Sequence, residues 1–121
     1  MNPHPACLDH YFAAWNAHDA AAIRQHLDQA FRADTRYFDP HRQAVGIDEF
    51  AACLQAFRAE SPSATVAWAS GVDAHHHLHR YAWKLRVSDR ELVGYDVIEL
   101  DDAGRIASVF SFFGPLPMLS P

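Results

Sequence analysis

The chain has 121 residues, of which 50% are hydrophobic and 21% charged, with no repetitive stretch. This length fits one domain, and this composition excludes a disordered chain or a fibrous repeat. Ten Lys and Arg against fifteen Asp and Glu give a formal net charge of −5. Without a basic cluster, that balance argues against a protein that binds nucleic acid through phosphate contacts.

Neither a disulfide framework nor a membrane span is expected. Cys7 and Cys53 are too few for the first, and the N-terminus lacks the basic and apolar segments of a signal peptide. The most apolar stretch, Ile106–Leu119, is short and contains a glycine and two prolines. We therefore expect a soluble, cytoplasmic protein with a single domain over residues 1–121.

The first half of the chain predicts three helices. In the first, apolar side chains recur at i, i+3, i+4 and i+7, the stripe of an amphipathic helix: Leu8, Tyr11, Phe12 and Trp15. Asp19 is placed to cap a second helix through its side-chain oxygen. A third helix follows Gly46 and ends at Ser61-Pro62.

The rest of the chain predicts strands. A short one, Thr35–Phe38, ends at Asp39-Pro40 because proline lacks the ladder N–H, and a polar loop follows over residues 41–45. Further strands are expected over Thr65–Ala69, His76–Val87, Leu92–Leu100 and Arg105–Phe113, with a turn near 71–74. This order indicates an α+β fold, a cone-shaped barrel in which a curved antiparallel sheet wraps around the N-terminal helices. Ligand pockets favour the open mouth of such a cone.

Five pieces of the sequence resemble one group of proteins. In order along residues 8–114 they are Tyr11–Asp19 (YFAAWNAHD), Phe38-Asp39-Pro40, Gly94-Tyr95-Asp96, Gly104-Arg105-Ile106 and Phe112-Phe113-Gly114. Together they are similar to the nuclear transport factor 2-like superfamily with its cystatin-like fold, and to its SnoaL-like and ketosteroid-isomerase-like proteins. That superfamily includes isomerases, cyclases, dehydratases, epoxide hydrolases and non-catalytic binding proteins, so the resemblance does not by itself assign an activity.

The resemblance to ketosteroid isomerase implies three catalytic residues. Tyr11 falls on that family's oxyanion-hole tyrosine, Asp39 on its general base, and Asp96 on its second oxyanion donor, a carboxylic acid that an apolar site keeps protonated. Enolisation needs a base near an α-proton and hydrogen-bond donors at the carbonyl oxygen. One departure is that a supporting tyrosine of those enzymes falls on Leu54 here.

Each of the three residues also has a structural interpretation. Asp39, followed by proline, can end a strand and accept hydrogen bonds from turn N–H groups. Tyr11 can pack in the core with a satisfied hydroxyl. Asp96 lies in an otherwise apolar strand, where a carboxylate is costly to bury unless paired. It therefore either faces a pocket or forms a salt bridge with Arg80 or Arg105.

Aromatic side chains are expected to wall the pocket and to raise a carboxylate pKa by desolvation. The predicted pocket residues are Trp15, Phe38, His41, Trp83, Phe110 and Phe113. The loop His41-Arg42-Gln43 is more polar and basic than the corresponding isomerase loop, which indicates either a partly anionic ligand or a solvated rim. His41 could also orient a ligand or act as an acid near neutral pH.

We expect no metal and no cofactor. His75, His76, His77 and His79 crowd one strand start, but no HExxH or CxxC spacing organises them, and a solvated strand end is the simpler interpretation. No neighbouring base marks either cysteine as a nucleophile, and the sequence shows no serine-centred elbow and no glycine-rich phosphate loop.

The leading hypothesis is a cofactor-independent enzyme that moves a proton next to the carbonyl of a small hydrophobic or partly polar ligand. An isomerase or a SnoaL-like polyketide cyclase does this. The alternative is a non-catalytic small-ligand-binding or dimerisation module, and a third possibility is a dehydratase with Tyr11 or His41 as acid. The resemblance also implies a homodimer through the outer face of the sheet, with His79, Tyr81 or Phe112 on that face.

Overall fold

The computed structural model describes residues 4–120. Its helices are α1 (Ala6–Asn16), α2 (Ala20–Ala30) and α3 (Ile47–Glu60). Asp19 caps α2 as predicted, because the backbone N–H of Ala22 donates to its Oδ1 at 2.8 Å. Within the described range, no helix has both the length and the apolar character needed to cross a membrane.

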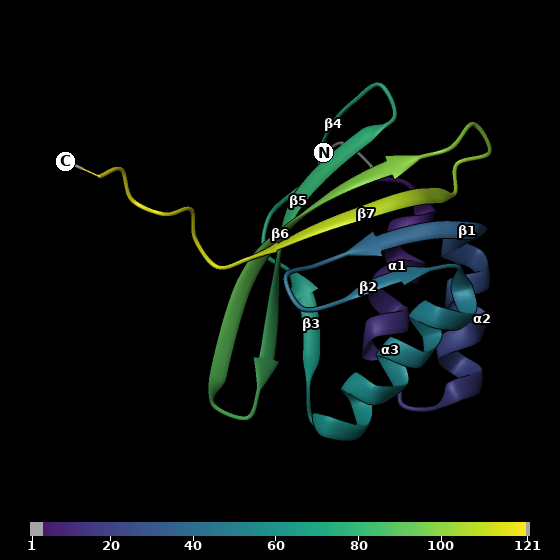
Figure 1. The fold of residues 1–121 in the computed structure, drawn as a ribbon, viewed down its shortest axis with the longest axis horizontal. Coiled ribbons are helices and arrows are strands. Elements are labelled where there is room, and N and C mark those ends of the chain that lie inside the picture. Colours follow the sequence, from purple (N-terminus) through teal and green to yellow (C-terminus); the bar gives the residue numbers. More distant parts are fainter. Residues whose placement is uncertain (1–3, 121) are drawn as a thin grey trace.

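The strands form one curved sheet that does not close on itself. They are β1 (Phe31–Phe38), β2 (Gln43–Val45), β3 (Thr65–Trp68), β4 (Asp73–His75), β5 (Leu78–Val87), β6 (Arg90–Leu100) and β7 (Ile106–Phe113). Their order in the sheet is β2-β1-β7-β6-β5-β3, with β4 paired to β5. The three helices lie on one side of this sheet, and the C-terminal tail runs away from it (Figure 1). The predicted α+β cone is confirmed.

The structure differs from the sequence prediction in three details. The strands β2 and β4 occupy the predicted loop and turn, and β1 pairs with β7 in parallel, so the sheet is mixed. Three-residue strands are too short to show alternation and depend on their neighbours for pairing. The strand β1 also begins earlier than predicted, because a register shift between Phe31 and Arg36 interrupts its alternation.

The core fills the space between the helices and the inner face of the sheet. Tyr11, Phe31, Tyr37 and Phe50 are each no more than 2% exposed, and their rings pack with centroids 4.6 to 6.1 Å apart. Fully burying a side chain of this size stabilises the fold by roughly 1.5–3 kcal/mol. The aromatic cluster therefore contributes a large share of stability and continues directly into the wall of the site described next.

One polar contact holds α1 against the edge of the sheet. The Asn16 amide donates to the carbonyl of Val66 and accepts from its N–H, both at 2.8 Å. These two bonds satisfy backbone groups of Val66 on the edge of β3 where no further strand of the described residues pairs with it. It places the end of α1, which carries Trp15, beside β3.

Candidate active site

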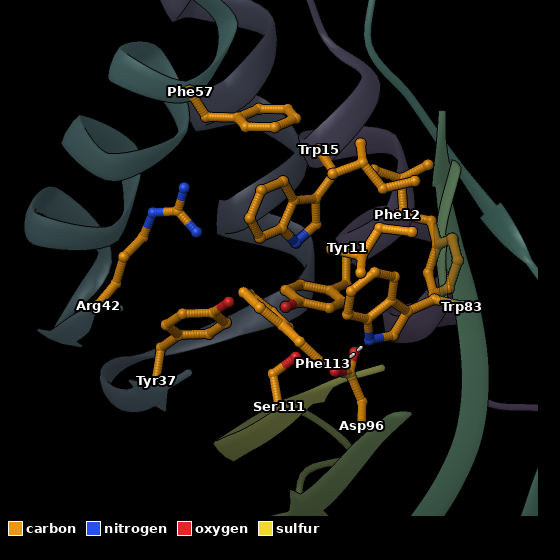
Figure 2. A pocket seen from close by; sticks show the side chains of 13 residues that line it. Tyr11, Phe12, Trp15, Tyr37, Arg42, Phe57, Trp83, Asp96, Ser111 and Phe113 are labelled. Carbon is orange, nitrogen blue, oxygen red and sulfur yellow. Dashed lines mark hydrogen bonds between the residues drawn. The ribbon is translucent and has the colours of Figure 1, made fainter. Parts of the chain in front are cut away.

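A cavity of about 100 Å³ lies between the helices and the inner face of the sheet. Its walls are mostly apolar and include Phe12, Trp15, Phe57, Trp83, Leu85 and Phe113. Its polar lining comes from Tyr11, Tyr37, Arg42, Asp96 and Ser111. Among the described residues that line it, Arg42 is the only cation and Asp96 the only anion. Figure 2 shows these two on opposite sides of the aromatic rings.

Strand register brings the groups around Asp96 together. Asp96 on β6 lies directly opposite Tyr81 on β5 and Ser111 on β7. Residues directly opposite one another on neighbouring strands point to the same face of the sheet, so these three side chains lie together. Trp83, two residues beyond Tyr81, shares that face, and Gly94 opposite it leaves room for the indole.

Asp96 is a hydrogen-bond acceptor in a desolvated place. It is 3% exposed. The Tyr81 hydroxyl donates to its Oδ2 at 2.7 Å and the Trp83 indole N–H to its Oδ1 at 2.9 Å. Among the described residues, no arginine, lysine or histidine pairs with it, since Arg80 binds Asp73 and Arg105 binds backbone carbonyls. Of its two sequence-based alternatives, the structure therefore shows the pocket position.

Burial raises the pKa of Asp96 to about 6, while the side chains of Ser111, Tyr81 and Trp83 limit the rise. The carboxyl group is therefore mostly ionised at pH 7. The resemblance implied a protonated Asp96 that donates a hydrogen bond, but both hydrogen bonds found here run the other way. The arrangement suits a group that accepts a proton near neutral pH.

Tyr11 lines the cavity and keeps its proton. Burial raises the pKa of its phenol well above the ordinary value, and the charge of Asp96 adds to the rise. The neighbouring Trp15 side chain opposes the effect in part. A buried neutral phenol of this kind is a hydrogen-bond donor for a ligand oxygen.

Asp39 is held in a turn instead of facing the cavity. Its Oδ1 accepts from the backbone N–H groups of His41 and Arg42, at 2.7 and 2.8 Å. Its Oδ2 accepts from the Tyr37 hydroxyl at 2.6 Å and from Arg42 Nη1 at 3.0 Å. This geometry matches the structural interpretation of Asp39, in which its carboxylate ends a strand and accepts hydrogen bonds from turn N–H groups. Asp39 is not among the cavity-lining residues, but two of its partners, Tyr37 and Arg42, are.

Three of the six predicted pocket residues line the cavity: Trp15, Trp83 and Phe113. Phe38 and Phe110 are register partners and stack on one another at 5.9 Å on the outer face of the sheet. Alternation turns their neighbours Tyr37 and Val109 inward. His41 is exposed and packs its ring 5.5 Å from that of Phe113.

Sequence reasoning missed most of the polar lining. Tyr81 was expected on the outer face, and this is wrong, because its hydroxyl binds Asp96 from the inside. The signal was available in part, because Tyr81 and Trp83 are two residues apart in one predicted strand and therefore point to the same side. Tyr37 and Ser111 needed the register of β1 and β7, which their short patterns do not specify.

The clustered histidines show no metal-binding arrangement. His75, His76 and His77 are exposed. Across residues 4–120, no three or more His, Cys, Asp or Glu side chains are grouped so that they could hold a metal ion.

A curved sheet packed over three helices, with an aromatic cavity between them, defines a protein of the nuclear transport factor 2-like superfamily. Within it, the chain is 33% identical to a protein of the SnoaL-like family from Agrobacterium tumefaciens str. C58, proposed to be an isomerase. The match covers 91% of this chain and 96% of that one, with a TM-score of 0.84. The chain therefore belongs to the SnoaL-like family.

More distant structures share the fold. A proposed ketosteroid isomerase from Kribbella flavida DSM 17836 is 20% identical over 97% of this chain and 82% of that one, with a TM-score of 0.72. A proposed polyketide cyclase from Sinorhizobium meliloti is 17% identical over 89% and 94%, also with a TM-score of 0.72. No protein-family profile matches the chain. No functionally curated protein matches it either.

Proposed function

We propose that this protein is an enzyme that moves a proton next to the carbonyl group of a small ligand, as an isomerase or a polyketide cyclase does. One observation carries the proposal. A desolvated carboxylate with a pKa of about 6 and no cationic partner among the described residues faces the same aromatic cavity as a neutral phenol. Perturbed groups gathered in a cavity are typical of active sites. The SnoaL-like relative, proposed to be an isomerase, supports the same class of reaction.

The residues divide the chemistry as follows. Asp96 takes a proton from the carbon next to the carbonyl, and the C–H electron pair moves onto the carbonyl oxygen. Tyr11 donates a hydrogen bond to that oxygen as its negative charge develops. In an isomerisation, Asp96 returns the proton to another carbon of the conjugated system. In a cyclisation, the enolate carbon instead attacks a second carbonyl carbon, and Asp96 gives its proton to the alkoxide oxygen that forms there. Neither path therefore changes an oxidation state overall or needs an oxidant.

This division differs from the one that the resemblance implied. There the base is Asp39, and that assignment stays a prediction. We favour Asp96 because all four hydrogen bonds of Asp39 are made within its own turn and to Tyr37. A carboxylate whose lone pairs all accept hydrogen bonds within the protein has none free for a ligand.

The test is a small β,γ-unsaturated ketone, cyclohex-3-en-1-one, whose conversion to the conjugated enone is followed by ultraviolet absorbance. We expect the protein to accelerate the conversion above the rate in buffer and to lose this effect on heat denaturation. A rate equal to that of a heat-denatured sample would contradict the proposal for this reaction class.

The activity should depend on pH through Asp96. Because the basic form of a group with a pKa of about 6 is populated above that pH, kcat/KM should rise with pH and level off above about 7. The measurement is kcat/KM for the same ketone from pH 4.5 to about 8.5, with circular dichroism at each pH to confirm folding. A profile that is flat through pH 6, or that falls with rising pH, would remove Asp96 from the role of base.

A second candidate function is a binding module without chemistry. It is favoured by the arginine that holds Asp39, which is what a site that has lost its base would show. The two functions differ in one measurement. A module would bind carbonyl ligands in the cavity yet leave the exchange of their α-protons with D₂O unchanged, whereas an active Asp96 would accelerate that exchange.

We also propose that a second copy of the chain covers the outer face of the sheet. Tyr95 and Phe112 are register partners on β6 and β7 and are 43% and 61% exposed. Their side chains point to the outer face of the sheet, away from the cavity, whereas those of Asp96 and Ser111 point to the inner face. Contiguous exposed aromatic side chains mark protein interaction sites.

Phe112→Asp should convert this dimer to a monomer, because a carboxylate cannot be desolvated at an apolar interface without a partner. Size-exclusion chromatography with light scattering measures the mass. Leu119→Asp, further along the exposed tail, is the control for added charge, because Leu119 does not line the groove on the outer face that contains Tyr95 and Phe112. A wild-type chain that is monomeric across the concentrations tested would contradict the proposal.

A further inference from the structure

The cavity has two polar ends of opposite charge. Asp96 and Tyr11 form one end, and Arg42 forms the other (Figure 2). The Arg42 side chain is 32% exposed, whereas that of Asp39 is completely buried. A charge that is partly withdrawn from water is costly unless it is paired, and Asp39 supplies one partner for Arg42.

The structure holds Arg42 in place without using up its donors. Nη1 donates to Asp39 Oδ2 at 3.0 Å. Across residues 4–120, neither Nε nor Nη2 of Arg42 has a hydrogen-bond acceptor, and Figure 2 shows the guanidinium turned toward the aromatic rings. Since a guanidinium carries five N–H donors in a rigid fork, the ones left over are available to a ligand.

Asp39 does not simply cancel the charge of Arg42. Its two oxygens also accept from two backbone N–H groups and from the Tyr37 hydroxyl. Its negative charge is therefore shared among four donors, and the carboxylate acts as an anchor that fixes the guanidinium. Tyr37, bound to the same oxygen, lies beside Arg42 in the cavity lining.

We propose that the ligand of this cavity carries a carboxylate that binds Arg42, while its carbonyl group lies at Tyr11 and Asp96. A planar carboxylate matches the guanidinium fork and can accept two parallel N–H bonds. The charge of Asp96 repels an anion from the other end, so the ligand enters in one orientation only. The substrate class is thus a small keto acid with an unsaturated or aromatic body between its two polar groups. The position of its carbonyl rests on the proposed function, whereas binding through Arg42 does not require turnover.

The experiment compares two single-ring probes, 4-acetylbenzoate and its methyl ester, which lacks the negative charge and carries one more methyl group; the Arg42 variants separate the effect of charge from that of size. Binding is followed by quenching of tryptophan fluorescence, since Trp15 and Trp83 line the cavity. We expect the acid to bind roughly tenfold or more tightly than the ester, as for a charge-assisted hydrogen bond. Arg42→Gln should remove this preference, and Arg42→Lys, which keeps the charge but not the fork, should keep part of it.

Equal dissociation constants for the two probes on the wild-type protein would overturn the proposal, as would failure of both to bind. A preference for the acid that persists in Arg42→Gln would overturn it too. The wild-type comparison decides the question even if a variant does not fold, which circular dichroism reports. Failure of the proposed function is seen separately, as loss of proton transfer with an intact preference for the acid.

Discussion

Asp96→Asn should lower kcat/KM for a β,γ-unsaturated ketone by about 10²–10⁴-fold, the usual contribution of a general base. The amide has nearly the shape of the carboxylate but takes up no proton. It can keep both hydrogen bonds, because its oxygen accepts from the Trp83 indole while its NH₂ donates to the Tyr81 hydroxyl. The loss should therefore fall on the chemical step and not on the shape of the cavity. Steady-state kinetics of the purified variant measure it.

Stability should not account for this loss. Burial raises the pKa of Asp96, so the ionised form is costly in the folded state. That cost grows as pH rises from the ordinary carboxyl pKa through about 6, and it is full at pH 7. A neutral asparagine avoids it, so Asp96→Asn should unfold in urea at or above the wild-type midpoint at pH 7.

Asp39→Asn is the matched comparison. If Asp96 is the base, Asp39→Asn acts only through its turn and through Arg42, and we expect kcat/KM to fall by about tenfold or less. If the base is Asp39, as the resemblance implies, the order of the two effects reverses. Equal and small effects of both substitutions would remove proton abstraction by either carboxylate and favour the binding module.

The long elements and the inward position of Asp96 could be predicted from the sequence. The stripe around Tyr11 and the alternation around Trp83 each repeat several times, so their period is clear. Asp96 stands out because a carboxylate in an apolar strand needs a reason to be there. These signals are local. The way in which the elements pack together was inferred from the resemblance of five pieces of the sequence to a known superfamily.

The other half of the site depends on contacts that no local pattern contains. Phe38 and Tyr37 are adjacent aromatic residues, and a one-residue choice of register decides which of them faces the cavity. Arg42 belongs to a polar loop for which the sequence left two interpretations open, a partly anionic ligand or a solvated rim. It lines the cavity with its guanidinium bound to the buried Asp39 carboxylate, within the loop that joins β1 and β2. The same bond occupies Oδ2 of Asp39, the residue that the motif suggested as the base.

Gly94→Ala should destabilise the protein by about 3 kcal/mol or more, because overpacking a filled position forces its neighbours to move. A Cβ at Gly94 would lie 2.1 Å from Trp83 Cζ2 and 2.4 Å from the carbonyl oxygen of Phe112. The indole could swing aside only by giving up its bond to Asp96, and the carbonyl belongs to the neighbouring strand β7. Urea denaturation, with tryptophan fluorescence to report on Trp83, measures the loss.

Gly71→Ala is the control, since a Cβ there meets nothing within 4 Å. It should change stability by no more than about 0.5 kcal/mol, as most exposed substitutions do. The pair separates a general cost of replacing glycine from the specific need for space beneath Trp83. If Gly94→Ala were as stable as Gly71→Ala, the indole would not occupy the position that binds Asp96. The pKa of Asp96 would then be higher, because the hydrogen bond from Trp83 that lowers it would be missing. The rise of kcat/KM with pH would accordingly move to higher pH.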